Sequence, residues 1–175
     1  KTVLLTAAGS DCAVLLGQWA RQAGAEAVYG IHRSPVHAQR LAEMGIVPIA
    51  QHDTAAVNAA AVQAEVVYDA TGGSLAETIL SVMPETGTFV CYGLLSGQTF
   101  RQQRPLPRVA WFHIRNYLDA LNAEAWQAEF RRIWPKLRAS QCSDVTLYPL
   151  SEWQRAVGNY REAGRTGKPM LSMDN

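Results

Sequence analysis

The stretch VLLTAAGSDCAVLLGQWARQAGA, residues 3–25, joins a short apolar run to an amphipathic segment through a turn of small residues. The apolar run predicts a strand over Thr2–Thr6, and the spacing after it predicts a helix over Cys12–Ala23 that ends before Gly24. A helix placed directly after such a strand points its unpaired amides and the positive end of its dipole at the sheet edge. The stretch therefore predicts a turn at which a phosphate group can bind.

The alternation of apolar runs and amphipathic segments continues beyond this first unit. Apolar runs rich in β-branched residues predict further strands at 27–31, 47–50, 65–70, 86–92 and 109–118. The segments between the first five strands predict helices at 35–44, 54–63 and 74–83. This pattern indicates an α/β fold, a Rossmann-like doubly wound parallel sheet of about six strands with helices on both faces.

We expect two parts in the chain. Residues 1–122 form the predicted nucleotide-binding core, and residues 123–175 add a helix, a strand, a helix and a last strand. The segment before the sixth strand, residues 93–108, is rich in glycine, proline, glutamine and arginine, which predicts a long loop. Arg101, Arg104 and Arg108 are spaced along it, either as solvated side chains or as contacts to an anionic substrate tail.

Composition excludes several classes of function. The 175 residues carry a net charge of +1 with 18% charged side chains, so there is no basic field to attract nucleic acid. The apolar runs are shorter than the roughly 18 residues of a membrane-spanning helix, and no signal peptide opens the chain. We therefore expect a soluble, cytoplasmic protein without nucleic-acid or membrane partners. The three cysteines have neither the spacing of a zinc site nor that of a disulfide framework.

The turn after the first strand is the strongest local signal for ligand binding. Gly9, Ser10 and Ala13 are small enough for a diphosphate to approach the backbone. Asp11 opposes this, because a carboxylate beside a diphosphate weakens binding unless it points to solvent or caps the helix. Cys12 lies at the same helix start, where its thiol is either reactive or a packing group. A strand, turn and helix also occur in α/β proteins that bind no dinucleotide.

The residues after the second strand indicate which dinucleotide is bound. NAD sites usually present an acid there to the ribose hydroxyls, whereas NADP sites present an arginine to the 2′-phosphate. This chain has no acid at that place but has His32, Arg33 and Ser34. The pattern favours NADP(H), the alternative being that Arg33 is an ordinary exposed turn residue.

Two more loops are predicted at the same edge of the sheet. The loop DATGG, residues 69–73, follows the fourth strand, and YGLLSG, residues 92–97, follows the fifth. Ligands of open α/β sheets bind beyond the carboxyl ends of the strands, so these loops are expected to border the same cleft. The sequence has neither a Tyr-x-x-x-Lys arrangement nor a Gly-x-Ser-x-Gly elbow, and we predict no catalytic residue and no metal ligand in it.

Taken together, the order of these motifs resembles the cofactor-binding part of the medium-chain dehydrogenase/reductase superfamily. The resemblance is strongest to its zinc-independent quinone oxidoreductases and 2-enoyl thioester reductases. It rests on residues 3–25 and on the pieces HRSPVHAQRLAEMG, VVYDATGG, GTFVCYGLLSG and YPLSEWQRAVGNYREAGRTGKPMLSM. It implies an NADPH-dependent oxidoreductase that delivers hydride to a quinone or an activated carbon–carbon double bond.

The resemblance also implies roles for individual residues, from one end of the cofactor to the other. The residues implied at the pyrophosphate are Ser10, Asp11, Cys12 and Ala13. Those implied around the adenosine 2′-phosphate are His32, Arg33 and Ser34. Those implied at the nicotinamide ribose are Thr71 and Gly72, and those at the nicotinamide face are Gly93, Leu94 and Leu95. The sequence departs from the family at Asp11 and Cys12, where glycine or alanine and valine are usual.

Members of the family carry a β-rich substrate domain ahead of the first strand, and this chain begins at Lys1 almost on that strand. We therefore expect that the domain that would bind the small-molecule substrate is absent and that the isolated chain is nearly inactive. Residues 123–175 resemble the part that packs on this domain, so an exposed apolar surface is expected near the last helix and strand. A homodimer through the edge strand at 109–118 is also expected, as in relatives.

Two other functions fit parts of the sequence. The first is a binding or oligomerisation module without catalysis, in which Asp11 has weakened cofactor affinity. The second is methyl transfer from S-adenosylmethionine, which also uses a parallel sheet and a glycine-rich first turn. Methyltransferases normally have an acid after the second strand, where this chain has His32 and Arg33.

Overall fold

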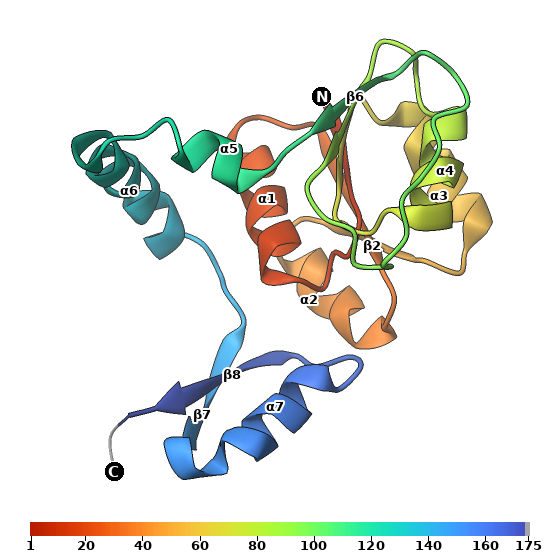
Figure 1. Ribbon diagram of the computed structural model, residues 1–175. Helices are drawn as coiled ribbons and strands as arrows, with labels where there is room; N and C mark the ends of the chain where they lie inside the picture. The colour runs from red at the N-terminus through yellow and green to blue at the C-terminus, as the bar shows by residue number, and fades with distance from the viewer. Residues whose placement is uncertain (174–175) are drawn as a thin grey trace.

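A six-stranded parallel sheet forms the centre of the molecule in the computed structural model, which describes residues 1–173 (Figure 1). The strands lie in the order β3-β2-β1-β4-β5-β6, and each neighbouring pair is parallel. Their bounds are β1 Thr2–Leu5, β2 Ala27–His32, β3 Val47–Ala50, β4 Val66–Asp69, β5 Thr88–Cys91 and β6 Arg108–Trp111. This is the doubly wound order, with its switch point between β1 and β4, and it confirms the predicted fold class.

Helices cover both faces of the sheet, as predicted. One face carries α1 and α2, and the other carries α3 and α4 (Figure 1). Their bounds are α1 Asp11–Gln22, α2 Ala38–Glu43, α3 Thr54–Gln63 and α4 Gly73–Val82. A short 3-10 turn at Pro35–His37 precedes α2, so the helix predicted at 35–44 is split in two.

Two buried clusters follow from the alternation of side chains along the strands. Leu4, Val67 and Phe89 point toward α3 and α4 in one cluster. Val3 and Leu5 point the other way, toward α1 and α2. Burial on both faces is the reason these strands read as continuous apolar runs rather than as alternating ones.

The sixth strand is shorter than predicted. Pairing with β5 ends at Trp111, and the last ladder bond runs from the Phe112 amide to the Cys91 carbonyl. Beyond Cys91 the neighbouring strand has ended, so the chain has no partner and turns into the short helix α5, Ile114–Leu118. The prediction of a strand over 109–118 is therefore wrong after residue 111, and His113 and Arg115 lie at the start of a helix rather than along a strand.

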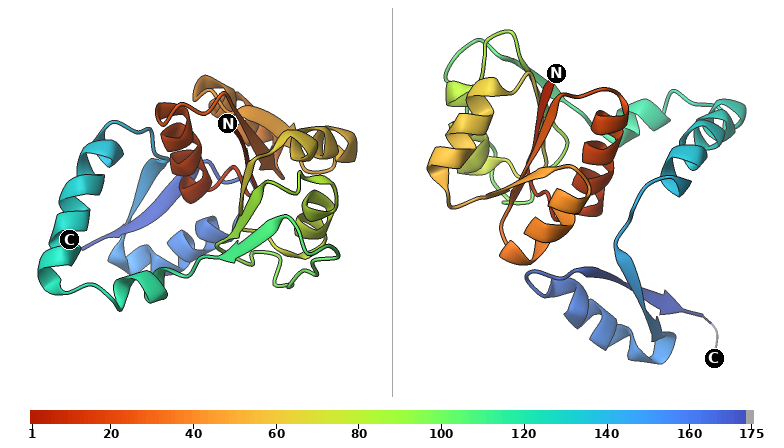
Figure 2. Two further views of the ribbon diagram at one scale, coloured as in Figure 1. Left: turned by 90° about the horizontal axis from the view of Figure 1, so that it is seen from above. Right: turned by 180° about the vertical axis from the view of Figure 1, so that it is seen from behind.

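The C-terminal part extends away from the main sheet: α6 lies to one side of it, and β7, α7 and β8 lie below it (Figure 1, Figure 2). Its elements are α6 Ala123–Arg138, β7 Asp144–Pro149, α7 Trp153–Arg161 and β8 Gly167–Ser172. The strands β7 and β8 pair in parallel as a separate two-stranded sheet, and α7 packs on both of them. We call residues 144–172 the C-terminal unit.

Large apolar side chains are exposed on the C-terminal unit, as predicted for the last helix and strand, and also on α6, where no exposure was predicted. On α6, positions 126, 130 and 134 place Trp126, Phe130 and Trp134 on one side of the helix. On the C-terminal unit the exposed apolar side chains include Val145, Leu147, Trp153, Val157, Tyr160 and Met170. Within residues 1–173, none of the helices is long and apolar enough to cross a membrane.

Replacing Phe89 tests the larger core. Its side chain is 0% exposed and points from β5 into the cluster that α3 and α4 cover. Phe89→Ala is expected to lower the free energy of unfolding by about 3–5 kcal/mol, because it removes apolar contacts and leaves a cavity. Urea unfolding followed by circular dichroism measures this. The matched control is Phe130→Ala on α6, where the side chain is 50% exposed and the loss is expected to stay below about 1 kcal/mol.

Candidate functional site

A cavity of about 390 Å³ opens at the carboxyl ends of the strands, above the switch point between β1 and β4. Every loop that follows strands β1 to β5 contributes to its wall, and one residue comes from the loop between α7 and β8. The lining residues are Ala7, Gly9, Ser10, Arg33, Ser34, His37, Gln51, Thr71, Leu95, Ser96 and Gly164. Several of these lining residues are polar, so the cavity suits a ligand with polar groups.

The turn between β1 and α1 forms one wall of the cavity. Ala7 has a left-handed backbone with φ of 48°, which turns the chain sharply at the end of the strand. Ser10 caps α1, because its Oγ accepts a hydrogen bond from the Ala13 amide at 3.3 Å. The amides of Asp11 and Cys12 open the helix, where no carbonyl of the preceding turn can pair with them. The turn therefore offers amide donors and a helix dipole to an anion.

Close packing at Gly9 sets the shape of the turn. A Cβ at this position would lie 2.5 Å from the His37 ring, which comes from the 3-10 turn before α2. Only glycine allows the two loops to approach this closely. The loops after β1 and β2 are thereby held together along one side of the cavity.

The loop after β2 places a free cation at the cavity. Arg33 is exposed, lines the cavity and forms no hydrogen bond or ion pair with the residues that the structure describes. Ser34 lines the cavity beside it. His32 is buried, and its Nδ1 lies 3.0 Å from the Ser34 carbonyl oxygen, so its ring holds the loop rather than facing the cavity.

Further cationic side chains lie near the end of the cavity that Arg33 and Ser34 line. Burial lowers the pKa of His37 from its ordinary value of 6.5, and the neighbouring charges of His32, Arg40 and Arg165 lower it further. His37 is therefore neutral at pH 7, and the positive field at this end of the cavity comes from arginines. Arg40 Nη2 and Arg165 Nε are buried nitrogens without a hydrogen-bond partner among residues 1–173. This end of the cavity therefore favours an anionic ligand group.

A buried network fixes the loop after β4. The Thr6 hydroxyl donates to Asp69 Oδ1 at 2.6 Å, and the same oxygen atom of Thr6 accepts from the Ala70 amide at 2.9 Å. Asp69 also accepts from the amides of Thr71 and Gly72, at 3.1 and 2.8 Å. The loop that carries Thr71 is thus tied to the end of β1, across the switch point.

The loop after β5 closes the far side of the cavity. Gly93 lies against the Ala70 backbone, and a Cβ there would be 3.0 Å from the Ala70 carbonyl oxygen. Leu95, 71% exposed, lines the cavity, whereas Leu94 packs over Gly72 without lining it. The Tyr92 hydroxyl is buried without a hydrogen-bond partner among the described residues, and burial is the main cause of its raised pKa.

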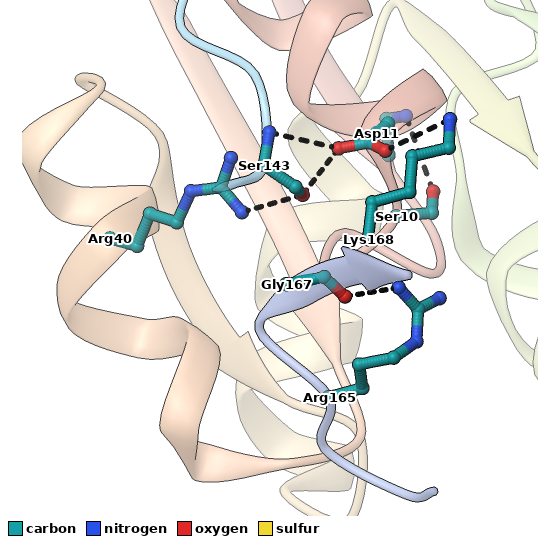
Figure 3. A network of polar contacts seen from close by, with 8 residues as sticks. Ser10, Asp11, Arg40, Ser143, Arg165, Gly167 and Lys168 are labelled. Carbon is teal, nitrogen blue, oxygen red and sulfur yellow. Dashed lines mark hydrogen bonds and ion pairs between the residues drawn. The ribbon is translucent and has the colours of Figure 1, made fainter. Parts of the chain in front are cut away.

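Asp11 adopts neither of the two placements considered from the sequence, since it neither points freely to solvent nor caps the helix. Its Oδ1 accepts hydrogen bonds from the Ser143 hydroxyl at 2.5 Å and the Ser143 amide at 3.2 Å (Figure 3). Its Oδ2 lies 3.6 Å from Lys168 Nζ on β8. The carboxylate is therefore engaged by the C-terminal part of the chain, and Asp11 does not line the cavity.

The structure brings together five of the predicted site residues as lining groups: Ser10, Arg33, Ser34, Thr71 and Leu95. The other seven surround or support the cavity without lining it: Asp11, Cys12, Ala13, His32, Gly72, Gly93 and Leu94. Sequence reasoning did not single out five lining residues, Ala7, His37, Gln51, Ser96 and Gly164, although Ser96 lies in the loop 92–97 that was predicted to border the cleft. Gln51 directly follows a predicted strand, which was a usable signal, whereas no local pattern marks Gly164.

Among residues 1–173, no group of three or more histidine, cysteine, aspartate or glutamate side chains is placed to hold a metal ion. The three cysteines are unpaired thiols, of which Cys12 and Cys142 are exposed and Cys91 is buried.

Comparison with known proteins identifies relatives of this fold. The family model described as zinc-binding dehydrogenase matches residues 13–135. A Bacillus thuringiensis protein assigned as an NADPH:quinone reductase superposes with a TM-score of 0.84 at 22% identity, over 98% of this chain and 56% of that one. The CurK enoyl reductase superposes with a TM-score of 0.77 at 20% identity, over 98% of this chain and 54% of that one. A quinone oxidoreductase from Pseudomonas syringae superposes with a TM-score of 0.75 at 20% identity, over 98% of this chain and 56% of that one.

These structural likenesses, at such low identity, establish the fold. The chain spans about half the length of the solved structures that it matches. A comparison with curated protein sequences found no significant match.

Acid titration tests the contacts of Asp11. Burial would raise its pKa, but the hydrogen bonds from Ser143 and the charges of Lys168 and Arg40 outweigh this and hold it below the ordinary 3.8. Because the folded-state pKa is lowered, the stabilisation is complete above the unfolded value and is lost as the pH falls through the folded value. The difference in free energy of unfolding between wild type and Asp11→Asn should therefore be constant from pH 7 to 5 and shrink below about pH 4.

Denaturant unfolding of both proteins at each pH measures this difference. Asp144→Asn, which replaces a neighbouring exposed acid outside these contacts, is the control. A difference that stays constant down to pH 2 would contradict the assignment.

Proposed function

The chain belongs to the zinc-binding dehydrogenase family, and on that premise we propose that it binds NADP(H) as the cofactor-binding part of a reductase. The reductase would transfer hydride to a quinone or to an activated carbon–carbon double bond. The family supports a nicotinamide dinucleotide as the ligand class. The preference for the phosphorylated form and the substrate class are our proposals.

The observation that carries the proposal is the free guanidinium of Arg33 in the wall of the cavity. It has no internal partner, and no acid stands at the end of β2 to accept the ribose hydroxyls. An arginine in this place pairs with a 2′-phosphate, whereas a carboxylate would repel it. Ser34 supplies a hydroxyl donor beside it.

The order of residues along the cavity supports one orientation of the cofactor. Ser10 and the free amides that follow it would hold the pyrophosphate. Thr71, fixed by the Asp69 network, would contact the nicotinamide ribose, and Leu95 would cover the nicotinamide face. The bound cofactor would supply the hydride, and the chain would orient it and keep water from one face of the ring.

The apolar surface on α6 and the C-terminal unit supports a further part of the proposal. We propose that it packs against a substrate-binding part of the same protein, since the chain matches only about half of each related structure. Substrate contacts and any proton donor would then come from that part. The 175-residue chain alone is expected to bind cofactor but turn over little substrate.

Arg33 is the residue whose replacement separates the two dinucleotides. Arg33→Ala is expected to weaken NADPH binding by about 10–100-fold, because one charge-assisted contact to the 2′-phosphate is lost. NADH binding should change less than about threefold. Isothermal titration calorimetry with both dinucleotides measures the two constants.

Arg131→Ala, which replaces an exposed arginine on α6 far along the chain from the cavity, is the matched control and should bind as wild type does. Equal losses for NADH and NADPH would contradict a 2′-phosphate contact. Failure of wild type to bind either dinucleotide would favour the module without catalysis, and selective binding of S-adenosylmethionine would favour methyl transfer.

The free edge of β6 supports a homodimer as a second proposal. The Phe112 amide bonds to β5, so by alternation the amides of Val109 and Trp111 face away from the sheet. The Trp111 side chain is 61% exposed and stacks on Phe100 at 5.1 Å. An exposed apolar edge strand of this kind pairs readily with a second copy of itself.

Replacing Trp111 tests this dimer. Sedimentation velocity of wild type is expected to give a species of about twice the 19.2 kDa chain mass. Trp111→Lys should shift it to the monomer, because a charged edge disfavours pairing. Trp153→Lys replaces a tryptophan on α7 of similar exposure, 52%, and should leave the dimer intact. A wild-type monomer would refute the proposal.

A further inference from the structure

A short segment before β7 runs along α1 and is bonded to it at three places. The Trp19 indole N–H donates to Ser140 Oγ at 2.9 Å. Gln18 and Gln141 exchange two hydrogen bonds, each of 2.9 Å, between side chain and backbone. Ser143 binds Asp11 at the first residue of the helix. We call residues 140–143 the strap.

Asp11 is the end point of the strap and also contacts the second strand of the C-terminal unit. The Ser143 hydroxyl donates to Asp11 and accepts from Arg40 Nη1 at 3.0 Å, which links α1, α2 and the strap (Figure 3). Lys168 on β8 reaches the other carboxylate oxygen of Asp11. One side chain thus contacts the segment before β7 and the start of β8.

The position of the C-terminal unit matters for the cavity because one of its loops forms part of the wall. Gly164, in the loop between α7 and β8, lines the cavity and packs on Ser34. A Cβ at Gly164 would lie 2.8 Å from the Ser34 hydroxyl. Any shift of the unit away from α1 would open the cavity next to Arg33 and Ser34.

We propose that Asp11 is a positioning residue that anchors the C-terminal unit on α1 and so holds the Gly164 loop as a wall of the cofactor cavity. The inference rests on the proposed NADP(H) binding. Asp11 contributes its backbone amide to the turn between β1 and α1, where the pyrophosphate would bind. Its carboxylate points away from the cavity toward Ser143 and Lys168. Asp11, which departs from the family pattern, then supports NADP(H) binding instead of weakening it.

The proposal makes cofactor binding and docking of the unit depend on each other. A cofactor that needs the Gly164 wall binds the docked arrangement more tightly, so by linkage it must also favour docking. The alternative, in which Asp11 only repels the diphosphate, predicts the opposite sign for its removal. The two readings are therefore separable by one substitution.

The test uses the 175-residue chain with Asp11→Ala, Ser143→Ala and the double variant. Asp11→Ala removes the carboxylate. Ser143→Ala removes the hydroxyl that donates to this carboxylate and leaves the turn between β1 and α1 unchanged. Ser151→Ala, an exposed serine of the C-terminal unit, is the matched control. Hydrogen exchange of amides 140–148, read by NMR without cofactor and with NADPH, reports docking. Calorimetry reports the NADPH dissociation constant.

In Asp11→Ala, exchange at the Ser143 amide is expected to rise about tenfold or more, and the NADPH dissociation constant to rise about fivefold. Ser143→Ala should show smaller changes in the same directions. The double variant should show no faster amide exchange and no weaker NADPH binding than Asp11→Ala, because both substitutions break the same contact between Asp11 and Ser143. NADPH should slow exchange over residues 140–148 in wild type.

Unchanged amide exchange in Asp11→Ala would contradict the claim that Asp11 anchors the C-terminal unit. Tighter NADPH binding in that variant would contradict the claim that docking of the unit favours cofactor binding. If wild type bound no NADPH, the proposed function would fall, while exchange without cofactor would still decide whether Asp11 anchors the unit.

Discussion

The hydrogen bond from Thr6 to Asp69 is the contact on which the site depends. It joins the end of β1 to the end of β4 at 2.6 Å, where the winding of the sheet reverses. Both side chains are 0% exposed, so each needs an internal partner, and together they also bind three backbone amides of the loop after β4. The two walls that flank the switch point are thereby held at a set separation.

Charge is distributed unevenly around the resulting cavity. Arg33, Arg40, Arg165 and Lys168 lie on or near one end. The carboxylate of Asp11 contacts Lys168 directly and Arg40 through Ser143. An arginine without an internal partner is a ready contact for an anion, whereas an arginine already bonded within the fold is not. This difference separates Arg33, which faces the ligand cavity, from Arg40, which holds the strap.

The C-terminal part of the chain serves two surfaces at once. One side of it meets α1 through the strap and places Gly164 at the cavity. Its other side, with α6, exposes large aromatic and aliphatic side chains that no described residue covers. The same part of the chain therefore borders the cavity and carries the exposed apolar surface.

The sequence by itself determined the sheet, its helices and the edge at which the cavity opens. Local patterns suffice for these, because buried parallel strands read as apolar runs and a doubly wound sheet gathers the loops after its strands at one edge. Ser10, Arg33 and Ser34 were found in this way, whereas local patterns gave only the loops of Thr71 and Leu95 and the family resemblance implied these two residues. The exposed apolar surface near the last helix and strand was implied by the family resemblance, and the structure shows it.

Only the tertiary structure decided the partners of side chains that are far apart in sequence. Asp11 meets Ser143 and Lys168 across more than a hundred residues, and no periodicity or spacing predicts such a pairing. The end of β6 at Trp111 was likewise decided by where its neighbour β5 stops, not by its own apolar residues. Gly164 became part of the cavity because the strap holds its unit in place, and a contact of this kind exists only once the chain has folded.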